Sequence, residues 1–320
     1  MAGVLNGFAV IVALVALGWV LARTGVLGND ARLVLNRLVF FVATPALLFD
    51  SLARTTLDQV FTGVFVVSAV SAMIIAVLYM AIARLWLRRS ASDLVIGALS
   101  AGYVNSANLG IPIALYVLGD LGFVMPLLLF QVVVLQPIAI AVLERAQSKN
   151  AGTDEAHAEG GALKGALDAI MQSIRTPIVL AALAGLGVAA LPWSLPDTVL
   201  EPVHLVGQIS VPGALLVFGM SLYGVKVLEA GASPRREIGL ASVLKLVAHP
   251  LLAYAIGAWV LGMVGHDLLT VVVAAGLPTA QNVLVVATRY NRGILLARDS
   301  AVLTTLGALP VLLLVSALLA

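Results

Sequence analysis

The chain has 320 residues, of which 61% are hydrophobic and only 11% are charged. Soluble domains carry about 25% charged residues, so this composition excludes a water-soluble fold and is typical of an integral membrane protein. The sequence has no cysteine, which excludes disulfides and thiolate metal sites. The formal net charge of +2 comes from short basic clusters between apolar runs, a pattern that argues against nucleic-acid binding.

Apolar runs follow one another along the chain, and most are about 18 residues or longer, enough for a helix to cross a hydrocarbon core. The runs are continuously apolar, which excludes the alternating strands of a membrane barrel. The first run, Val4 to Ala22, has no basic residue before it and is expected to be a mature helix, not a secretory signal. The ten expected spans are residues 3–22, 34–53, 60–83, 92–118, 122–143, 176–192, 204–224, 239–262, 267–288 and 299–319.

The basic residues predict the orientation of these spans. Of the 18 Lys and Arg residues, 16 lie in the connections after spans 1, 3, 5, 7 and 9, Arg54 follows span 2, and Lys245 lies inside span 8. By the positive-inside rule the odd connections are cytoplasmic, so both termini lie outside the inner cell membrane. Omitting one span would scramble this alternation, which therefore supports ten transmembrane helices.

The longest polar connection divides the chain. Residues 147–175 are expected to form a cytoplasmic loop, with a short amphipathic helix over Ala162 to Ile174. On either side lie residues 1–146 and 176–320, each with five spans. Because five is an odd number, the second half enters the membrane from the opposite side. The fold class predicted is therefore an all-α membrane protein built as a 5+5 inverted repeat.

Spans four and nine are interrupted by polar residues and proline. Span four carries Asn105, Asn108 and Pro112, and we expect the helix to break at Pro112, because proline lacks an N–H and crowds the preceding turn. The two amides could bind the backbone groups released there. Alternatively, such residues merely kink a helix and bridge it to its neighbours.

Span nine repeats the pattern around a second proline. Pro278 is followed closely by Gln281 and Asn282, and we expect a second break at Pro278. Two broken helices in corresponding positions of inverted halves are the best sequence indication of a transporter binding site.

Lys245 is the only basic residue well inside a span, and no Asp or Glu lies comparably deep. A membrane lysine without a carboxylate partner is costly, so we expect it to attract an anionic substrate; the alternative is a bond to backbone carbonyls at a helix break. His249 lies four residues later, on the same helix face, and is a candidate for proton coupling, although a histidine bonded to a neighbouring helix is the favoured interpretation.

Other classes of function have little support. The sequence has neither the metal-binding His-Glu-x-x-His motif nor a phosphate-binding Gly-Lys-Ser/Thr loop, and we expect no enzyme activity, no cofactor and no metal. A cation antiporter would need carboxylates inside the membrane. A Ser/Lys hydrolase using Ser106 and Lys245 is a minor alternative.

These residues resemble the auxin efflux carrier family, which includes plant auxin exporters and bacterial malate or malonate permeases. The resemblance covers essentially the whole chain and depends on three motifs: Asn108-Leu109-Gly110-Ile111-Pro112, Lys245 with His249-Pro250, and Pro278-Thr279-Ala280-Gln281-Asn282.

The resemblance implies an elevator carrier with a scaffold of spans 1, 2, 6 and 7, a moving transport domain of spans 3–5 and 8–10, and a homodimer formed through the scaffold. It places substrate-binding residues at the two crossing broken helices, with Lys245 beside them. Auxin is not the expected substrate, because Val283 replaces a proline of the auxin exporters and span three has no acidic partner for Lys245. The implied positions are Asn105, Asn108, Ile111 and Pro112 in the first crossover and Gln281, Asn282 and Val283 in the second.

The sequence thus predicts a secondary transporter of a small organic anion, a mono- or dicarboxylate, held by half-helix N-termini and amides near Lys245. Its partners are this substrate and the lipid bilayer. One alternative is a sodium-coupled symporter of the bile-acid type, which shares the ten-helix architecture. Another is a membrane sensor that binds the ligand without moving it.

Overall fold

The computed structural model describes residues 2–28, 30–54, 63–119, 121–150, 164, 167–168, 170–171, 174–191, 195–224, 227–229 and 231–319. These residues form helices, and the one strand-like feature among them is an isolated bridge between Val104 and Thr279. The all-helical prediction is therefore confirmed for the described part of the chain. Most of the loop 147–175, with much of the amphipathic helix expected over Ala162 to Ile174, lies outside the described residues. Those residues of the expected helix that are described, 164, 167–168, 170–171 and 174, are helical.

Several helices have the length and apolar composition needed to cross a membrane, as a multi-pass membrane protein requires. Within the described residues the five long ones are Ala31–Ala53, Gly63–Trp86, Asp197–Leu222, Arg235–Val260 and Ile294–Leu319. The shorter apolar helices are Phe8–Thr24, Ala91–Gly102, Ser106–Leu118, Pro177–Ala189 and Gly265–Gly276. Span 5 coincides with the helical residues Val124–Asn150, and every other expected span coincides with a helix or a pair of half-helices, while the number of crossings stays a prediction.

The chain forms two compact units, and both draw on residues from before and after the loop 147–175. The first unit comprises Met1–Thr62, Ala107–Pro126 and Ile174–Val225, and the second comprises Gly63–Ser106, Leu127–Ser173 and Lys226–Ala320. Expected spans 1, 2, 6 and 7 therefore fall in the first unit. Spans 3, 8, 9 and 10 fall in the second with nearly all of span 5, whereas span 4 is divided between the units.

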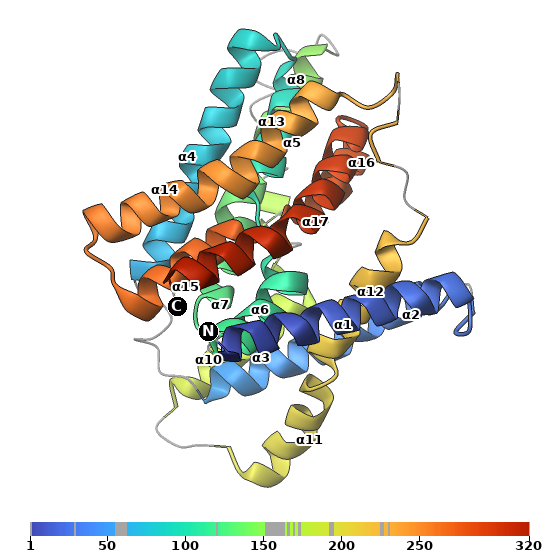
Figure 1. The fold of residues 1–320 in the computed structure, drawn as a ribbon, viewed down its shortest axis with the longest axis vertical. Helices are drawn as coiled ribbons and strands as arrows, with labels where there is room; N and C mark the ends of the chain where they lie inside the picture. The colour runs from blue at the N-terminus through green and yellow to red at the C-terminus, as the bar shows by residue number, and fades with distance from the viewer. Residues whose placement is uncertain are drawn as a thin grey trace. The chain divides into compact units, whose positions relative to one another are not determined.

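The helices of the first unit approach one another closely at small residues. Figure 1 shows α1 and α12 lying side by side, and a Cβ added to Gly219 of α12 would clash with the carbonyl oxygen of Val15. Small residues are how membrane helices gain van der Waals contact without a hydrophobic driving force. The elements are α1 (Ala2–Thr24), α2 (Ala31–Leu38), η1 (Val39–Ala43), α3 (Thr44–Ala53), η3 (Ser106–Gly110), α6 (Ile111–Ile113), η4 (Ala114–Leu118), α10 (Pro177–Ala189), α11 (Asp197–Gly207) and α12 (Ser210–Leu222), of which η3 begins in the second unit.

The packing of α10 on α3 gives a matched pair of predictions. A Cβ on Gly185 would lie 2.8 Å from the backbone oxygen of Phe49, so Gly185→Ala should destabilise the protein by about 1–3 kcal/mol. The control is Gly187→Ala on the same helix, where an added Cβ meets nothing within 4 Å and alanine has the better helix propensity. Thermal melting of the two purified variants tests this, and equal melting temperatures would contradict the close approach.

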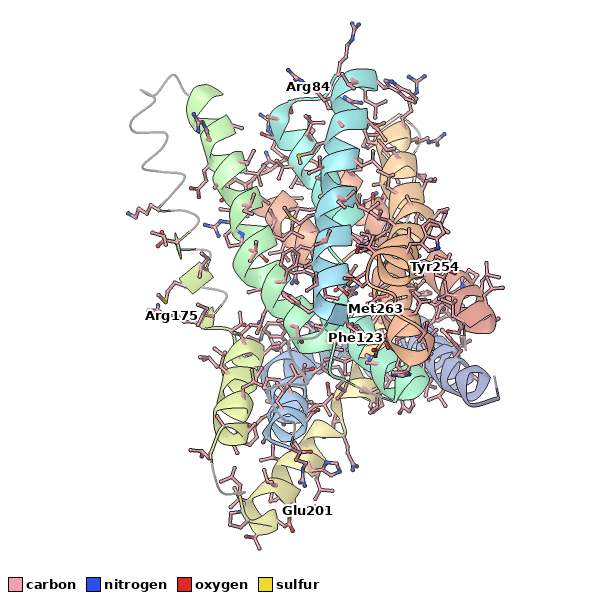
Figure 2. All side chains as sticks on the ribbon, turned by 90° about the vertical axis from the view of Figure 1, so that its left-hand side faces the viewer. Arg84, Phe123, Arg175, Glu201, Tyr254 and Met263 are labelled. Carbon is pink, nitrogen blue, oxygen red and sulfur yellow. The ribbon has the colours of Figure 1, made fainter. Side chains whose placement is uncertain are left out.

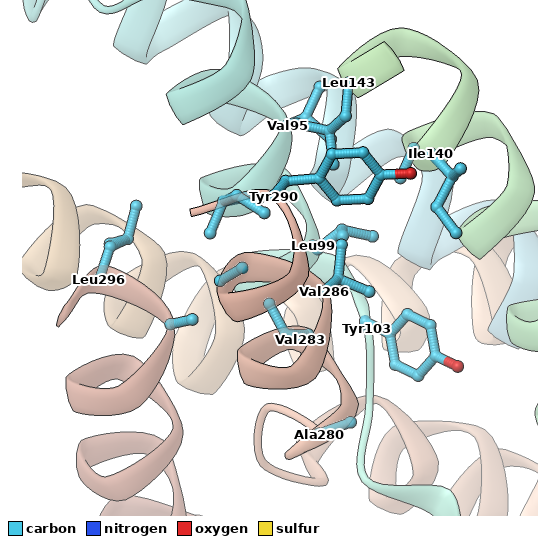
Figure 3. Packing of buried hydrophobic residues seen from close by; sticks show 14 of the residues in the cluster. Val95, Leu99, Tyr103, Ile140, Leu143, Ala280, Val283, Val286, Tyr290 and Leu296 are labelled. Atoms are coloured by element: carbon cyan, nitrogen blue, oxygen red, sulfur yellow. The ribbon is translucent and has the colours of Figure 1, made fainter. Parts of the chain in front are cut away.

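The second unit surrounds a core drawn from both halves of the sequence. Figure 3 shows its larger apolar cluster, in which Val95 and Leu99 pack with Val283 and Val286. The elements are α4 (Gly63–Trp86), α5 (Ala91–Gly102), the end of α7 (Val124–Phe130), η5 (Gln131–Leu135), α8 (Gln136–Asn150), α13 (Arg235–Val243), η6 (Leu244–Ala248), α14 (His249–Ala255), η7 (Ile256–Val260), α15 (Gly265–Gly276), α16 (Asn282–Arg289) and α17 (Ile294–Leu319).

The connections of the second unit gather at its two ends as the charge pattern predicts. At one end Arg89 pairs with Glu237, and the Tyr290 hydroxyl donates to Glu144 at 3.0 Å. These residues come from the segments around the connections after spans 3, 5, 7 and 9. Figure 2 shows Arg84 at the same end of α4, and Met263 near the opposite end, where it approaches Gly63. The odd connections of this unit therefore share one side.

Candidate functional site

Both interrupted spans break within the second unit, and each break is a short extended segment between two half-helices. The helix α5 ends at Gly102 and α15 ends at Gly276. The next helical residues are Ser106 and Asn282. The break predicted at Pro278 is present, since α15 has ended two residues earlier.

The first break does not lie at Pro112, where the sequence led us to expect it. It lies at residues 103–105, and Pro112 is at the start of the helical turn α6, between the π-helical turns η3 and η4. Proline is tolerated near the first position of a helix, and the wider π-turn rearranges the hydrogen bonds that proline would otherwise remove. The helix passes Pro112 for these two reasons.

The two extended segments bind each other where they cross. The N–H of Asn105 donates to the carbonyl of Pro278 at 2.8 Å, and the N–H of Ala280 donates to the carbonyl of Tyr103 at 3.1 Å. Figure 3 shows Tyr103 on its extended segment beside the loop that carries Ala280. Buried backbone groups must find partners, and this antiparallel pairing satisfies four of those released by the breaks.

Polar side chains from neighbouring helices complete the crossover. Gln131 accepts from the N–H of Val104 at 2.7 Å and donates to the Ser106 hydroxyl at 3.1 Å. Thr304 accepts from the N–H of Thr279 at 3.0 Å. Sequence analysis missed Gln131 and Thr304, whose one signal was that each is a polar residue inside an apolar span.

The expected substrate-binding residues divide between the units. Gln281 and Asn282 are exposed at the start of α16, and the Asn282 amide is hydrogen-bonded to the hydroxyl of Tyr103. Asn105 and Val283 are buried in the second unit. In the first unit Asn108 is half-buried, whereas Ile111 and Pro112 are buried and cannot offer a polar contact.

Lys245 and His249 form a buried polar chain in the second unit. Lys245 Nζ lies 3.1 Å from His249 Nδ1, and His249 Nε2 lies 3.2 Å from the Ser71 hydroxyl of α4. Lys245 and His249 are 0% and 1% exposed, so neither is solvated by bulk water. The shared helix face predicted for this pair is confirmed, while Ser71 was not foreseen.

The segment that carries Lys245 and His249 lies close to the half-helices that enter the crossover. Leu244 belongs to the same apolar cluster as Ala98 and Ala101 of α5. On the other side, a Cβ added to Gly276 would lie 3.8 Å from Pro250. The segment carrying Lys245 and His249 therefore packs near the C-terminal ends of both α5 and α15.

The polar side chains around the crossover include several hydrogen-bond donors. The amides of Gln281 and Asn282 are exposed at the N-terminus of α16, where the helix dipole is positive. Among the described residues no group of three or more His, Cys, Asp or Glu is placed to hold a metal ion.

Comparison with known proteins identifies a family of membrane transporters. A family described as membrane transport protein matches residues 4–316, which include both crossing segments and Lys245. The chain is 28% identical over 284 residues to a protein of Rhizobium meliloti (strain 1021) named "Putative malonate transporter", covering 87% of this chain and 84% of that one. It is 29% identical over 285 residues to an "Uncharacterized transporter" of Methanothermobacter thermautotrophicus, covering 87% and 85%.

Proposed function

Since the chain belongs to the membrane transport protein family, which is the auxin efflux carrier family, we propose that it is a secondary active transporter of a small organic anion. The single observation that carries this proposal is the crossover itself. Two helices break at one point, exposed amides stand at the start of α16, and a buried lysine lies on a segment that packs near the ends of α5 and α15. Broken helices of this kind bind substrates in other carriers.

The charge distribution supports an anion. The half-helix α16 begins at Asn282, and a helix N-terminus carries partial positive charge. Lys245, in the same unit, carries a full positive charge when it is protonated. No carboxylate among the described residues forms an ion pair with it. A carboxylate substrate would accept hydrogen bonds from the amides of Gln281 and Asn282.

Malonate is the substrate to test first. The relative from Rhizobium meliloti is named for malonate, and a small dicarboxylate suits a site made of a few amides and one lysine. A mono- or dicarboxylate of similar size is the wider class that we propose.

We also propose that transport follows an elevator mechanism in the inner cell membrane, with ten crossings and both termini outside. The composition of the two units supports this proposal, because spans 1, 2, 6 and 7 fall in one unit and nearly all other spans in the other. The first unit would be the scaffold and the site of homodimer contact, and the second would carry the substrate.

The test is thermal melting of the detergent-purified protein with malonate and a panel of other carboxylates. A ligand that binds only the folded state stabilises it by about 2.7 kcal/mol at one hundred times its dissociation constant. We expect one small carboxylate to raise the melting temperature, and no shift with any carboxylate would contradict the proposal.

Uptake into proteoliposomes then separates a carrier from its alternatives. A carrier accumulates radiolabelled malonate inside the vesicles, whereas a sensor binds it without flux. Uptake that requires sodium would favour the bile-acid type of symporter, and sodium-independent uptake would count against it.

A further inference from the structure

Lys245 is a buried base without an acidic partner. Its side chain is 0% exposed, and its hydrogen bond runs to His249 Nδ1 at 3.1 Å. Among the described residues no carboxylate lies within ion-pair distance of its nitrogen. A charged ammonium is costly in such a place unless a counter-charge is brought to it.

The hydrogen-bond chain favours one tautomer of His249. The Ser71 hydroxyl lies 3.3 Å from the carbonyl of Ser68, which can only accept, and it donates its one hydrogen there. With that hydrogen so placed, His249 Nε2 donates to the Ser71 oxygen at 3.2 Å. In the neutral ring Nδ1 is then the acceptor, and it receives a hydrogen from Lys245.

The same geometry limits the pair to one positive charge. If both Lys245 and His249 were protonated, two donors would face each other at 3.1 Å with no acceptor between them. The pair therefore holds one added proton or none. The hydrogen-bond chain also ends at the Ser68 carbonyl of α4, so it offers the proton no exit beyond that helix.

No other described titratable group replaces the missing counter-charge. The elements packed against η6 are α4, α5, α13, α14, α15 and α17. Their acidic residues lie near helix ends, in the first turns of α5, α13 and α15 and close to the start of α17. The titratable and charged groups on these elements are Tyr79, Arg84, Asp93, Arg235, Arg236, Glu237, His249, Tyr254, His266, Asp267, Arg298 and Asp299.

We propose that Lys245 is neutral in the empty carrier and takes up one proton when the anionic substrate binds, so that each anion travels with a proton. This inference deepens the proposed function and rests on it. The carboxylate supplies the counter-charge that the protein lacks, and the proton forms a bond to the Nζ lone pair to give the ammonium. His249 accepts a hydrogen bond from Lys245 in both states and positions it.

The proposed proton uptake determines how anion binding depends on pH. When the free protein lacks the proton and the complex holds it, binding weakens as pH rises, by about tenfold per pH unit for one proton. On release of the anion the ammonium loses its counter-charge and the proton leaves with it. An arginine at this position would stay charged throughout, because its guanidinium is not deprotonated in proteins.

The experiment is calorimetric titration of the purified protein with malonate in buffers of different ionisation enthalpy, above neutral pH, where malonate is a dianion. We expect uptake of about one proton per malonate bound in the wild type and none in Lys245→Arg. Malonate binding without proton uptake in the wild type would overturn this inference and leave the transporter proposal intact. No malonate binding at all would instead count against the proposed substrate class.

A second measurement covers the case in which Lys245→Arg does not fold or bind. The wild-type affinities for malonate and for difluoromalonate, a much stronger acid, are compared at one pH above neutral. Similar affinities place the proton on the protein, because the protein then takes it up whichever dianion binds. A loss of affinity for difluoromalonate in proportion to its greater acidity places the proton on the ligand and overturns the inference. His204→Gln is the control and should keep the wild-type proton count, because this half-buried histidine of α11 lies in the first unit and is paired there with Asp50.

Discussion

Lys245→Met should lose the thermal stabilisation by malonate that we expect of the wild type. The variant keeps an apolar side chain of similar length, so the packing of α13 and α14 is preserved while the charge is removed. Hydrogen bonds to charged groups contribute about 1.5–3 kcal/mol, so malonate affinity should fall by about ten- to one-hundredfold. Titration calorimetry and uptake into proteoliposomes measure this loss.

Arg84→Ala is the matched control for the removal of one positive charge. Arg84 lies exposed at the end of α4 (Figure 2), in the same unit but away from the buried chain. The Arg84→Ala variant should bind malonate as the wild type does. Unchanged malonate affinity in Lys245→Met would refute the anion site.

Gln131→Leu should be the most damaging single change that leaves the expected ligand contacts in place. The side chain is 1% exposed and is the hydrogen-bond partner of the Val104 N–H, so leucine would leave that group buried and unsatisfied. The expected cost is about 1–3 kcal/mol of folding free energy. Because Val104 pairs with Thr279 across the crossing, malonate binding should weaken as well. Thermal melting with and without malonate measures both effects.

Gln136→Leu provides the comparison, one helical turn further along the same span. Gln136 is half-buried and accepts a longer bond, 3.3 Å, from the Tyr103 hydroxyl. The Tyr103 hydroxyl has a second partner in the Asn282 amide. Gln136→Leu should therefore cost less folding free energy than Gln131→Leu. Equal destabilisation by the two substitutions would show that Gln131 has no special role in holding the crossover.

The broken helices could be predicted from the sequence because a proline acts on the helix that contains it. Pro278 removes a backbone donor, and the helix before it ends at Gly276 as expected. The error at Pro112 is also instructive. A proline predicts a break only if the chain around it stays α-helical, and the π-helical turns before and after Pro112 let the helix continue. The extended residues 103–105 carry no comparable signal.

The partners of the crossover could not be predicted, because they are distant in the sequence. Lys245 and His249 are four residues apart, so their contact follows from helix geometry. Ser71 is separated from His249 by 178 residues, and only tertiary packing brings them together. Gln131 was overlooked for the same reason, although a lone amide in an apolar span indicates a hydrogen bond to another helix.

The backbone pairing at the crossover has a consequence for biosynthesis. Asn105 and Tyr103 are made early, but their partners Pro278 and Ala280 emerge only near the end of translation. Until then the extended segment of the first half has unsatisfied backbone groups, which hydrocarbon does not tolerate. Contacts of such high sequence separation form late and slowly. The nascent chain therefore has to keep this segment hydrated or covered by insertion machinery until the last spans arrive, and truncation before Pro278 should yield a product that membrane proteases remove.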